Sequence, residues 1–173
     1  ARSEPVLVAY GITTTGNPVF LHLDGVSAES TAACVAFLED MVARGLDSPV
    51  LTVSDGAPGL CAALDQVFPA ARRQRCLIHR ARNCIAKVAE IDQDAVRADF
   101  WEIFDLDDTF SAGDVAVAEA RRRAEQFAAT WGRQYPGAVA CVTDGFEQLA
   151  AHLHFPRAHW SRIRHTNLIE RTF

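Results

Sequence analysis

Hydrophobic positions in the N-terminal part of the chain alternate between a strand period and a helix period. The apolar run PVLVAYGIT ends at the turn sequence TTTGNP, and VFLHLDG follows it, so the two runs predict a β-hairpin. Residues 27–45 have helical spacing, and we expect Ser27 to cap that helix and Gly45 to end it. A short apolar strand, PVLTVSDG, then precedes a helix with Pro58 in its first turn. This order is typical of an α/β protein with a mixed sheet.

A helical pattern replaces the alternating one in the second half of the chain. The stretch RQRCLIH predicts one more short strand, which runs into a helix over RARNCIAKVAEI. Residues 92–136 have helical spacing and no strand signal, so we expect two helices separated near DDTFSAGD, with Thr109 or Ser111 as the second N-cap. The expected apolar anchors of this helical region are Trp101, Phe104, Phe127 and Trp131.

Composition places the chain among globular domains from a reducing compartment. It has 173 residues, of which 49% are apolar and 23% are charged. No apolar run approaches the roughly 20 residues that a membrane span needs. The five cysteines are scattered and odd in number, which argues against a disulfide scaffold and favours the cytosol.

The net charge of −5 argues against nucleic-acid binding until its distribution is considered. Residues 71–88 contain five Arg, one Lys and no acid, whereas residues 90–119 contain ten acids and a single base, Arg97. Residues 157–171 contain four Arg, with Glu170 the only acid. A polyanion is therefore a candidate partner for the two basic stretches but not for the surface as a whole.

Asp55 is the first candidate for chemistry, because it follows an apolar strand and precedes Gly56. Open α/β sheets place ligands at the carboxyl ends of strands, and a carboxylate there suits a hard cation such as Mg²⁺. The alternative is a turn residue that caps the next helix, since Asp-Gly is a common turn pair. Asp144 is a rival acid, because VACVTDG echoes LTVSDG.

Glu170 is the second candidate. We expect a turn and then a helix that starts near Thr166 or Asn167, which would bring Asn167, Glu170 and Arg171 to one side. Nearby arginines keep a carboxylate ionised. The alternative is an exposed helix salt bridge, which contributes little stability.

Cys76 and His79 have the two-residue gap of half a zinc site. A structural zinc site needs four ligands, and His152 and His154 would supply the others only if the fold delivered them. We favour the alternative, in which Cys76 packs in the core and His79 makes hydrogen bonds near Asp55.

The order of these signals resembles a known family. RGLDSPVLTVSDGAPGLCAALDQVFPAARRQRCLIHRARN is similar to the central motif of the Mutator-type transposases of bacterial insertion sequences, in which SDG is followed by an apolar helix and by QRC-x-x-H-x-x-RN. HFPRAHWSRIRHTNLIERTF is similar to the closing motif, which carries the last acid of that family. One departure is His165, where the family usually has Thr.

The resemblance implies a ribonuclease-H-like α/β fold, with a mixed sheet flanked by helices and interrupted by an all-helical insertion. The expected segments are a core over residues 1–88 without its first strand, an insertion over 89–152, and a return to the core over 153–173. The resemblance also makes Asp55 and Glu170 the second and third acids of an Asp-Asp-Glu triad.

The chemistry implied by the resemblance is DNA transposition, in which these acids hold two Mg²⁺ (or Mn²⁺) ions. The arginines expected to bind DNA phosphates are Arg75, Arg80, Arg82, Arg164 and Arg171. The motif residues expected to have structural roles are Cys76, His79, Asn83 and Asn167. The expected partners are transposon ends and target DNA. We expect a homodimer or larger assembly on that DNA, in the bacterial cytoplasm and associated with the nucleoid.

The first catalytic Asp of the family lies on a strand upstream of the one that matches PVLVAYGI. We therefore expect this chain to lack that Asp and to be inactive alone, and Asp24, on a later strand, is no substitute. Two alternatives remain open. One is a domesticated, transposase-derived module that binds DNA or a protein without catalysis, and the other is a metal-dependent nuclease of the same fold. An Asp on the preceding strand would favour the enzyme, and a neutral residue there would favour the binding module.

Overall fold

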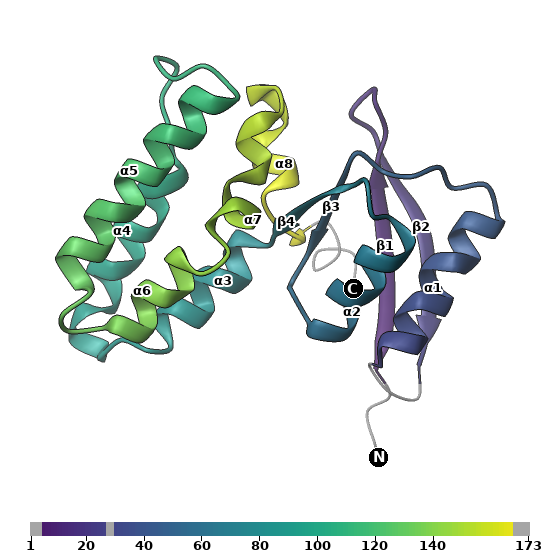
Figure 1. The fold of residues 1–173 in the computed structure, drawn as a ribbon, viewed down its shortest axis with the longest axis horizontal. Helices are drawn as coiled ribbons and strands as arrows, with labels where there is room; N and C mark the ends of the chain where they lie inside the picture. The colour runs from purple at the N-terminus through teal and green to yellow at the C-terminus, as the bar shows by residue number, and fades with distance from the viewer. Residues whose placement is uncertain (1–4, 27–29, 168–173) are drawn as a thin grey trace. The chain divides into compact units, whose positions relative to one another are not determined.

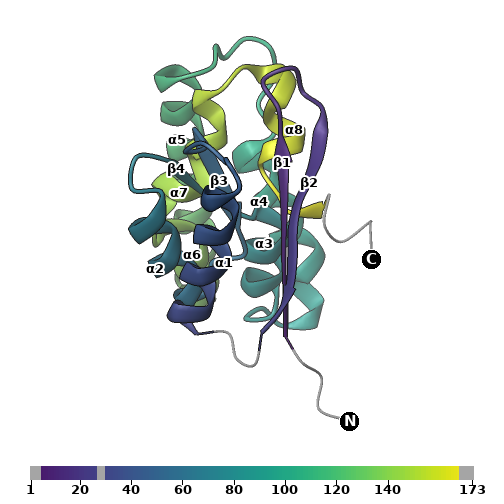
Figure 2. The same ribbon diagram turned by 90° about the vertical axis from the view of Figure 1, so that its right-hand side faces the viewer.

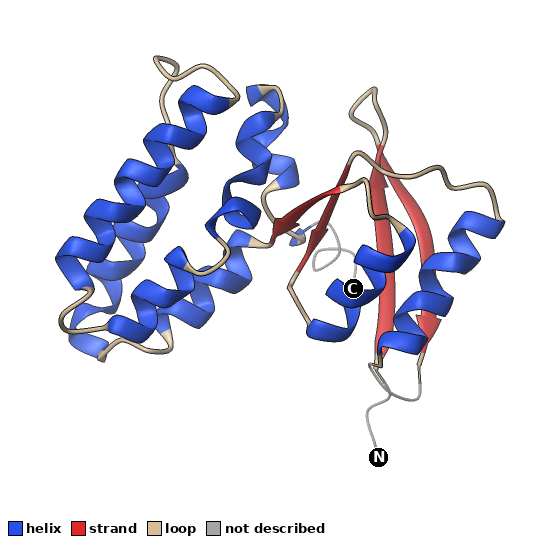
Figure 3. Ribbon diagram, viewed as in Figure 1, coloured by secondary structure: helices blue, strands red, loops and turns tan. Residues whose placement is uncertain are grey.

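The computed structural model describes residues 5–26 and 30–167 (Figure 1). The chain divides into two compact units. The strand unit comprises Ala1–Arg73 and Thr166–Phe173, and the helical unit comprises Gln74–His165. The described residues form strands only as far as Arg75, and helices, turns and loops follow (Figure 3).

The strand unit has the predicted succession of strand, strand, helix, strand, helix and strand. Its elements within the described residues are β1 (Val6–Ile12), β2 (Pro18–Gly25), α1 (Thr31–Ala43), β3 (Leu51–Ser54), α2 (Pro58–Val67) and β4 (Arg72–Arg75), the last of which crosses the boundary of the unit. The prediction of an α/β protein is therefore confirmed.

The hairpin of β1 and β2 is antiparallel, with Val6 opposite Gly25 and a bulge between Ala9 and Tyr10. Gly16 closes its turn at φ 83°, a left-handed conformation that glycine adopts without a steric penalty from Cβ. The second sheet pairs β3 with β4. The described residues thus form two two-stranded sheets instead of the single mixed sheet that the sequence predicted.

The core of the strand unit lies between its two helices and one face of the hairpin. Its buried residues are Cys34, Phe37, Leu38, Met41, Ala63, Leu64, Phe68 and Ala71. Leu7, Ala9 and Leu21 of the hairpin pack against them. Helix α1 begins after Ser30, whose Oγ accepts a hydrogen bond from the N–H of Ala33 at 3.2 Å.

Ser30 therefore replaces the predicted cap Ser27, which lies outside the described residues. The predicted end of the helix is confirmed, since Gly45 follows the C-cap at φ 99°.

The helical unit packs its helices around one apolar cluster. Its elements within the described residues are α3 (Leu77–Ile85), η1 (Glu90–Asp92), α4 (Gln93–Phe104), α5 (Asp114–Trp131), α6 (Pro136–Thr143), α7 (Phe146–Ala150), η2 (Ala151–His154), η3 (Arg157–His159) and α8 (Trp160–Ile163). The predicted anchors Phe104 and Phe127 are buried in the cluster, and Trp101 and Trp131 pack against it partly buried. None of the helices that the structure describes is long and apolar enough to cross a membrane.

Two predicted boundaries in this unit are wrong. The strand predicted over RQRCLIH ends at Arg75, because Leu77 already starts α3 and His79 lies inside it. Neither Thr109 nor Ser111 caps α5. Gly113 does so at φ 99°, and its N–H donates to the carbonyl of Leu153 at 2.8 Å.

Thr109 instead donates from its N–H and its hydroxyl to the carboxylate of Asp107, at 2.9 and 2.5 Å. At the C-terminal end a short helix that was not predicted, α8, covers Trp160–Ile163. The chain is helical again at Asn167, where the predicted helix begins and where the described part stops. The predicted segments 1–88, 89–152 and 153–173 stay a prediction. They describe where a helical insertion interrupts the core in the sequence, whereas the two units described above are defined by their compactness.

Candidate active site

Asp55 is exposed and directly follows the buried Ser54 at the end of β3. Its Oδ1 accepts a hydrogen bond from the N–H of Ala57, the N-cap residue of α2, at 2.9 Å. Gly56 between them has φ 89°, so the turn requires a residue that adopts the left-handed region. Asp55 does stabilise the turn, as the alternative reading expected. Its Oδ2 has no hydrogen-bond partner among the residues that the structure describes, so one carboxylate oxygen remains open to a ligand.

Glu170 and Arg171 lie outside the described residues. The segment that leads to them is held within the helical unit as far as Arg164. The carbonyl of Arg164 accepts the N–H of Leu77 at 2.9 Å, which satisfies one of the free donors at the start of α3. Its Nη1 donates to Oδ1 of Asp105 at 2.7 Å, and its guanidinium lies 5.4 Å from the ring centroid of Trp101. Three contacts thus fix Arg164, and Asn167 is half-buried at the end of the described chain.

Cys76 and His79 meet at the start of α3. The Nδ1 of His79 lies 3.1 Å from the Sγ of Cys76, and Cys76 is the buried N-cap residue of the helix. Cys76 therefore packs in the interior, as expected. Among residues 5–26 and 30–167, no group of three or more His, Cys, Asp or Glu side chains gathers in a way that could hold a metal ion.

The arginines expected to bind DNA have different surroundings. Arg80 donates from Nε to the carbonyl of Cys141 at 2.6 Å and from Nη2 to that of Asp144 at 2.9 Å, so it caps the C-terminal end of α6. Arg82 is exposed on α3. Arg75 is half-buried, and its Nε is enclosed without a partner in the described structure. Charge counting alone could not separate these three situations.

Sequence reasoning missed a buried polar pair formed by Gln74 and His152. The amide nitrogen of Gln74 donates to the carbonyls of Arg75 and Leu149, at 2.8 and 2.9 Å. Its amide oxygen accepts the backbone N–H of His152 at 2.7 Å, with Nδ1 of the same histidine at 3.2 Å. Burial, and after it the positive charge of Arg164, lower the pKa of His152 to about 3. The pair joins β4 to η2 and so holds the QRC motif against the end of the helical region.

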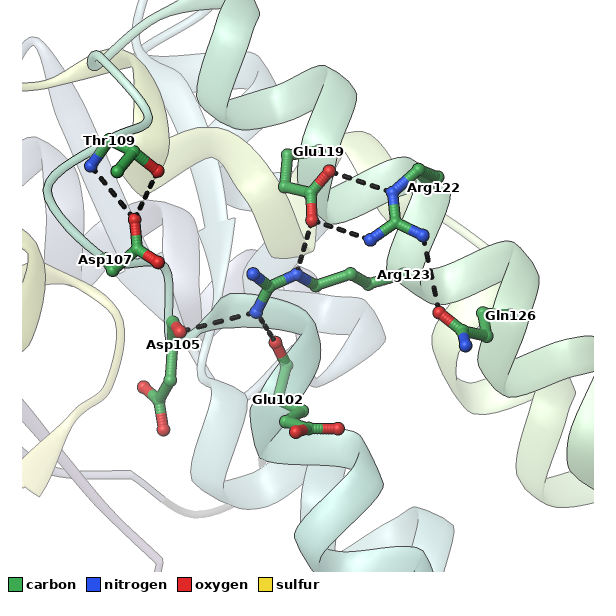
Figure 4. Close-up of polar contacts among 8 residues, drawn as sticks. All are labelled: Glu102, Asp105, Asp107, Thr109, Glu119, Arg122, Arg123 and Gln126. Carbon is green, nitrogen blue, oxygen red and sulfur yellow. Dashed lines mark hydrogen bonds and ion pairs between the residues drawn. The ribbon is translucent and has the colours of Figure 1, made fainter.

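Arg122 and Arg123, in the middle of α5, make contacts within that helix and with α4 (Figure 4). Glu119 accepts two hydrogen bonds from Arg122, at 2.8 and 2.9 Å, and one from Arg123 at 2.7 Å. These bonds, first from Arg122 and then from Arg123, lower the pKa of the Glu119 carboxyl to about 2. Arg123 also donates to the carbonyl of Glu102 at 2.7 Å, which joins α5 to α4.

Comparisons with known proteins agree with the motifs. The family model described as "Transposase, Mutator family" matches residues 1–172. The transposase for insertion sequence element IST2 of Acidithiobacillus ferrooxidans is 34% identical over 173 residues, which cover 97% of this chain and 54% of the relative. The transposase for insertion sequence element IS6120 of Mycolicibacterium smegmatis is 32% identical over 168 residues, with 97% and 50% covered. The chain therefore spans about half the length of these relatives.

Proposed function

Since the chain belongs to the Mutator family of transposases, we propose that it is the catalytic-core segment of an enzyme that cleaves and joins transposon DNA. The observation that carries the proposal is Asp55, a carboxylate at the carboxyl end of β3 inside the family motif. The proposed partners are transposon ends and target DNA, engaged by a homodimer or larger assembly in the bacterial cytoplasm, in association with the nucleoid.

The two small sheets of the strand unit support a ribonuclease-H-like core. Strand β1 pairs only with β2, and β3 pairs only with β4, among the described residues. Figures 1 and 2 both draw β3 on the β1 side of the hairpin. An open strand edge presents unpaired N–H and C=O groups that another strand can satisfy. One strand from a preceding segment, placed between β1 and β3, would join the two pairs into a single mixed sheet, and we propose that it carries the first acid.

The donor set fits a hard divalent cation. Asp55 offers a carboxylate oxygen, and Glu170 and the acid of the preceding segment would complete a set of oxygen ligands, which Mg²⁺ and Mn²⁺ prefer. Two bound ions would supply stabilisation of the attacking and leaving oxygens in phosphodiester cleavage and strand transfer. The chain's own contribution is to orient Asp55, because the hydrogen bond from the N–H of Ala57 fixes one carboxylate oxygen and thereby the direction of the other.

The arginines divide into two groups under this proposal. Arg75, Arg82 and Arg171 are assigned to DNA phosphates. Arg164 instead positions the segment that leads to Glu170, because its bonds to Leu77 and Asp105 are internal to the helical unit. We retain Arg80 as a DNA contact through its remaining nitrogen, Nη1.

The decisive experiment compares Asp55→Asn with Asp55→Ala in the full-length transposase. Asparagine keeps an oxygen that accepts the N–H of Ala57 but removes the charge, whereas alanine removes both. Strand transfer with Mg²⁺ or Mn²⁺ should fall below detection in both variants and in Glu170→Gln. Only Asp55→Ala should also lower the melting temperature. Strand transfer that survives in Asp55→Asn would refute the catalytic assignment and leave Asp55 as a turn residue.

A further inference from the structure

A groove runs between α3 and α6 in the helical unit. It is open to solvent, has a volume of about 430 Å³ and is lined by Arg80, Asn83, Ala86, Lys87 and Cys141. Its lining residues include neither of the carboxylates proposed for catalysis, and they carry two positive charges and no negative one. Lys87 is the only lysine of the 173-residue chain, in which the other basic residues that are not histidine are arginines.

The contacts between α3 and α6 fix both ends of the groove. Arg80 binds the carbonyls of Cys141 and Asp144 at the C-terminal end of α6. The stem of Lys87 lies against the first turn of α6, where a Cβ built on Gly137 would meet its Cδ at 3.3 Å. The two helices therefore run antiparallel, with one basic side chain anchored at each end of the groove.

The groove presents exposed hydrogen-bond donors that have no partner among the residues that the structure describes. Asn83 and Lys87 are exposed, and their side chains have no hydrogen bond or ion pair among residues 5–26 and 30–167. The same holds for Nη1 of Arg80 in this part of the chain. Arg80 and Asn83 lie three residues apart on α3, so their side chains share one face, and Lys87 follows in the turn after the helix ends at Ile85.

We propose that this groove binds the backbone phosphates of duplex DNA, with Lys87 and Nη1 of Arg80 as cationic contacts and the Asn83 amide as a neutral donor. The inference rests on the proposed function, which brings DNA to the protein, and it adds Asn83 and Lys87 to the DNA contacts already proposed on the helical unit. A lysine and an amide that meet the backbone carry no base readout, so this contact positions DNA without specifying its sequence.

The test uses full-length transposase and measures how its affinity for duplex DNA depends on NaCl concentration. Each phosphate contact contributes about 0.9 to the slope of log Kobs against log salt. Lys87→Met keeps the apolar stem, and should lower the slope by about 0.9 on transposon ends and on unrelated duplexes alike. Lys87→Arg should restore the slope. Arg97→Met is the matched control, because it removes an exposed charge paired with Asp94 outside the groove and should leave the slope unchanged.

A second measurement does not depend on any variant. Acetylation of Lys87 by an amine-reactive reagent, read by mass spectrometry of the peptide that contains it, should decrease several-fold when a duplex is bound. Inorganic phosphate at the same phosphate concentration should protect far less. Equal protection by inorganic phosphate would assign the groove to a small anion and overturn the DNA contact.

The outcomes separate this inference from the proposed function. If wild-type protein performs strand transfer and binds DNA with a salt-dependent affinity, an unchanged slope in Lys87→Met overturns the groove alone. If wild-type protein shows no salt-dependent binding to any duplex, both ideas fall. A slope that drops in Arg97→Met as much as in Lys87→Met also overturns the groove, because the effect would then reflect net charge.

Discussion

Mild acid is expected to destabilise the helical unit through a single residue, His152. This side chain is fully buried, and its Nδ1 lies 3.2 Å from the amide oxygen of Gln74 and 3.1 Å from the carbonyl of Leu149. Both neighbours are acceptors, so Nδ1 carries the proton of the neutral ring. Nε2 is enclosed without a partner in the described structure. Protonation there would bury a positive charge and an unpaired donor close to Arg164, which already carries a charge.

The magnitude follows from the pKa values in the two states. The pKa of His152 is about 3 in the folded protein, against 6.5 in the unfolded chain. Below pH 6.5 His152 is protonated in the unfolded chain but stays neutral in the folded protein. The contribution of His152 to the free energy of unfolding is therefore fully present above pH 6.5 and decreases as the pH falls toward 3. The slope is about 1.4 kcal/mol per pH unit, so acidification to pH 5 lowers the free energy of unfolding by about 2 kcal/mol.

Tryptophan fluorescence during urea denaturation measures this effect directly, because the three tryptophans, Trp101, Trp131 and Trp160, all lie in the helical unit. The comparison is wild type against His152→Phe, which cannot titrate. The variant loses the side-chain hydrogen bond to Gln74, at a cost of about 1 kcal/mol at neutral pH. The backbone N–H at position 152 still donates to Gln74.

Between pH 7 and pH 5 the wild type should lose about 2 kcal/mol relative to His152→Phe. The control is His159→Phe, a change at a half-buried histidine that should keep the acid sensitivity of the wild type. Parallel pH dependence in wild type and His152→Phe would refute the reasoning, because the acid sensitivity would then arise elsewhere.

Two further substitutions test the contacts that organise the helical unit. Gln74→Leu leaves the N–H of residue 152 without its partner and removes the amide that donates to the carbonyls of Arg75 and Leu149. The free energy of unfolding should therefore fall by about 2–4 kcal/mol in urea titrations, and a loss below about 0.5 kcal/mol would contradict the buried network. Arg164→Met and Asp105→Asn should each destabilise the unit, and a double-mutant cycle should give a coupling of about 0.5–1 kcal/mol, since the pair is partly exposed. A coupling near zero would show that the ion pair does not hold the C-terminal segment.

The existence and order of the elements in the strand unit could be predicted because each is coded locally. The hairpin follows from two apolar runs and one turn, and α2 follows from Pro58 at its start. The boundary of β4 was missed because Leu77, Ala81 and Cys84, all buried on α3, repeat at helical spacing within a stretch that also reads as a strand. Gly113 as the N-cap of α5 could not be predicted, since its N–H binds Leu153, 40 positions later in the chain.

The partners of the polar side chains were the least predictable part of the candidate site. Gln74 and His152 are 78 positions apart, and no local pattern relates them. The only local signal was a histidine inside the apolar stretch AAHLHF. A charge count treats Arg80 and Arg164 as free cations. Arg80 in fact binds backbone carbonyls 61 and 64 positions away in the sequence, and Arg164 binds the carboxylate of Asp105, 59 positions away. Basic stretches therefore overestimate the charge available to DNA.

Asp55 shows how a local and a functional role can share one side chain. The hydrogen bond from the N–H of Ala57 uses one carboxylate oxygen, and a side chain tied to the backbone in this way loses rotational freedom. That loss favours a metal ligand, because the remaining oxygen is oriented before a cation binds. The conformational entropy of the side chain is already reduced by the turn, so less of it is lost on binding. The turn role and the ligand role of Asp55 are thus compatible. It follows that loss of activity in Asp55→Ala cannot by itself identify a catalytic acid, since the same change releases the start of α2. Only the difference between Asp55→Asn and Asp55→Ala separates the charge of this residue from its bond to the backbone.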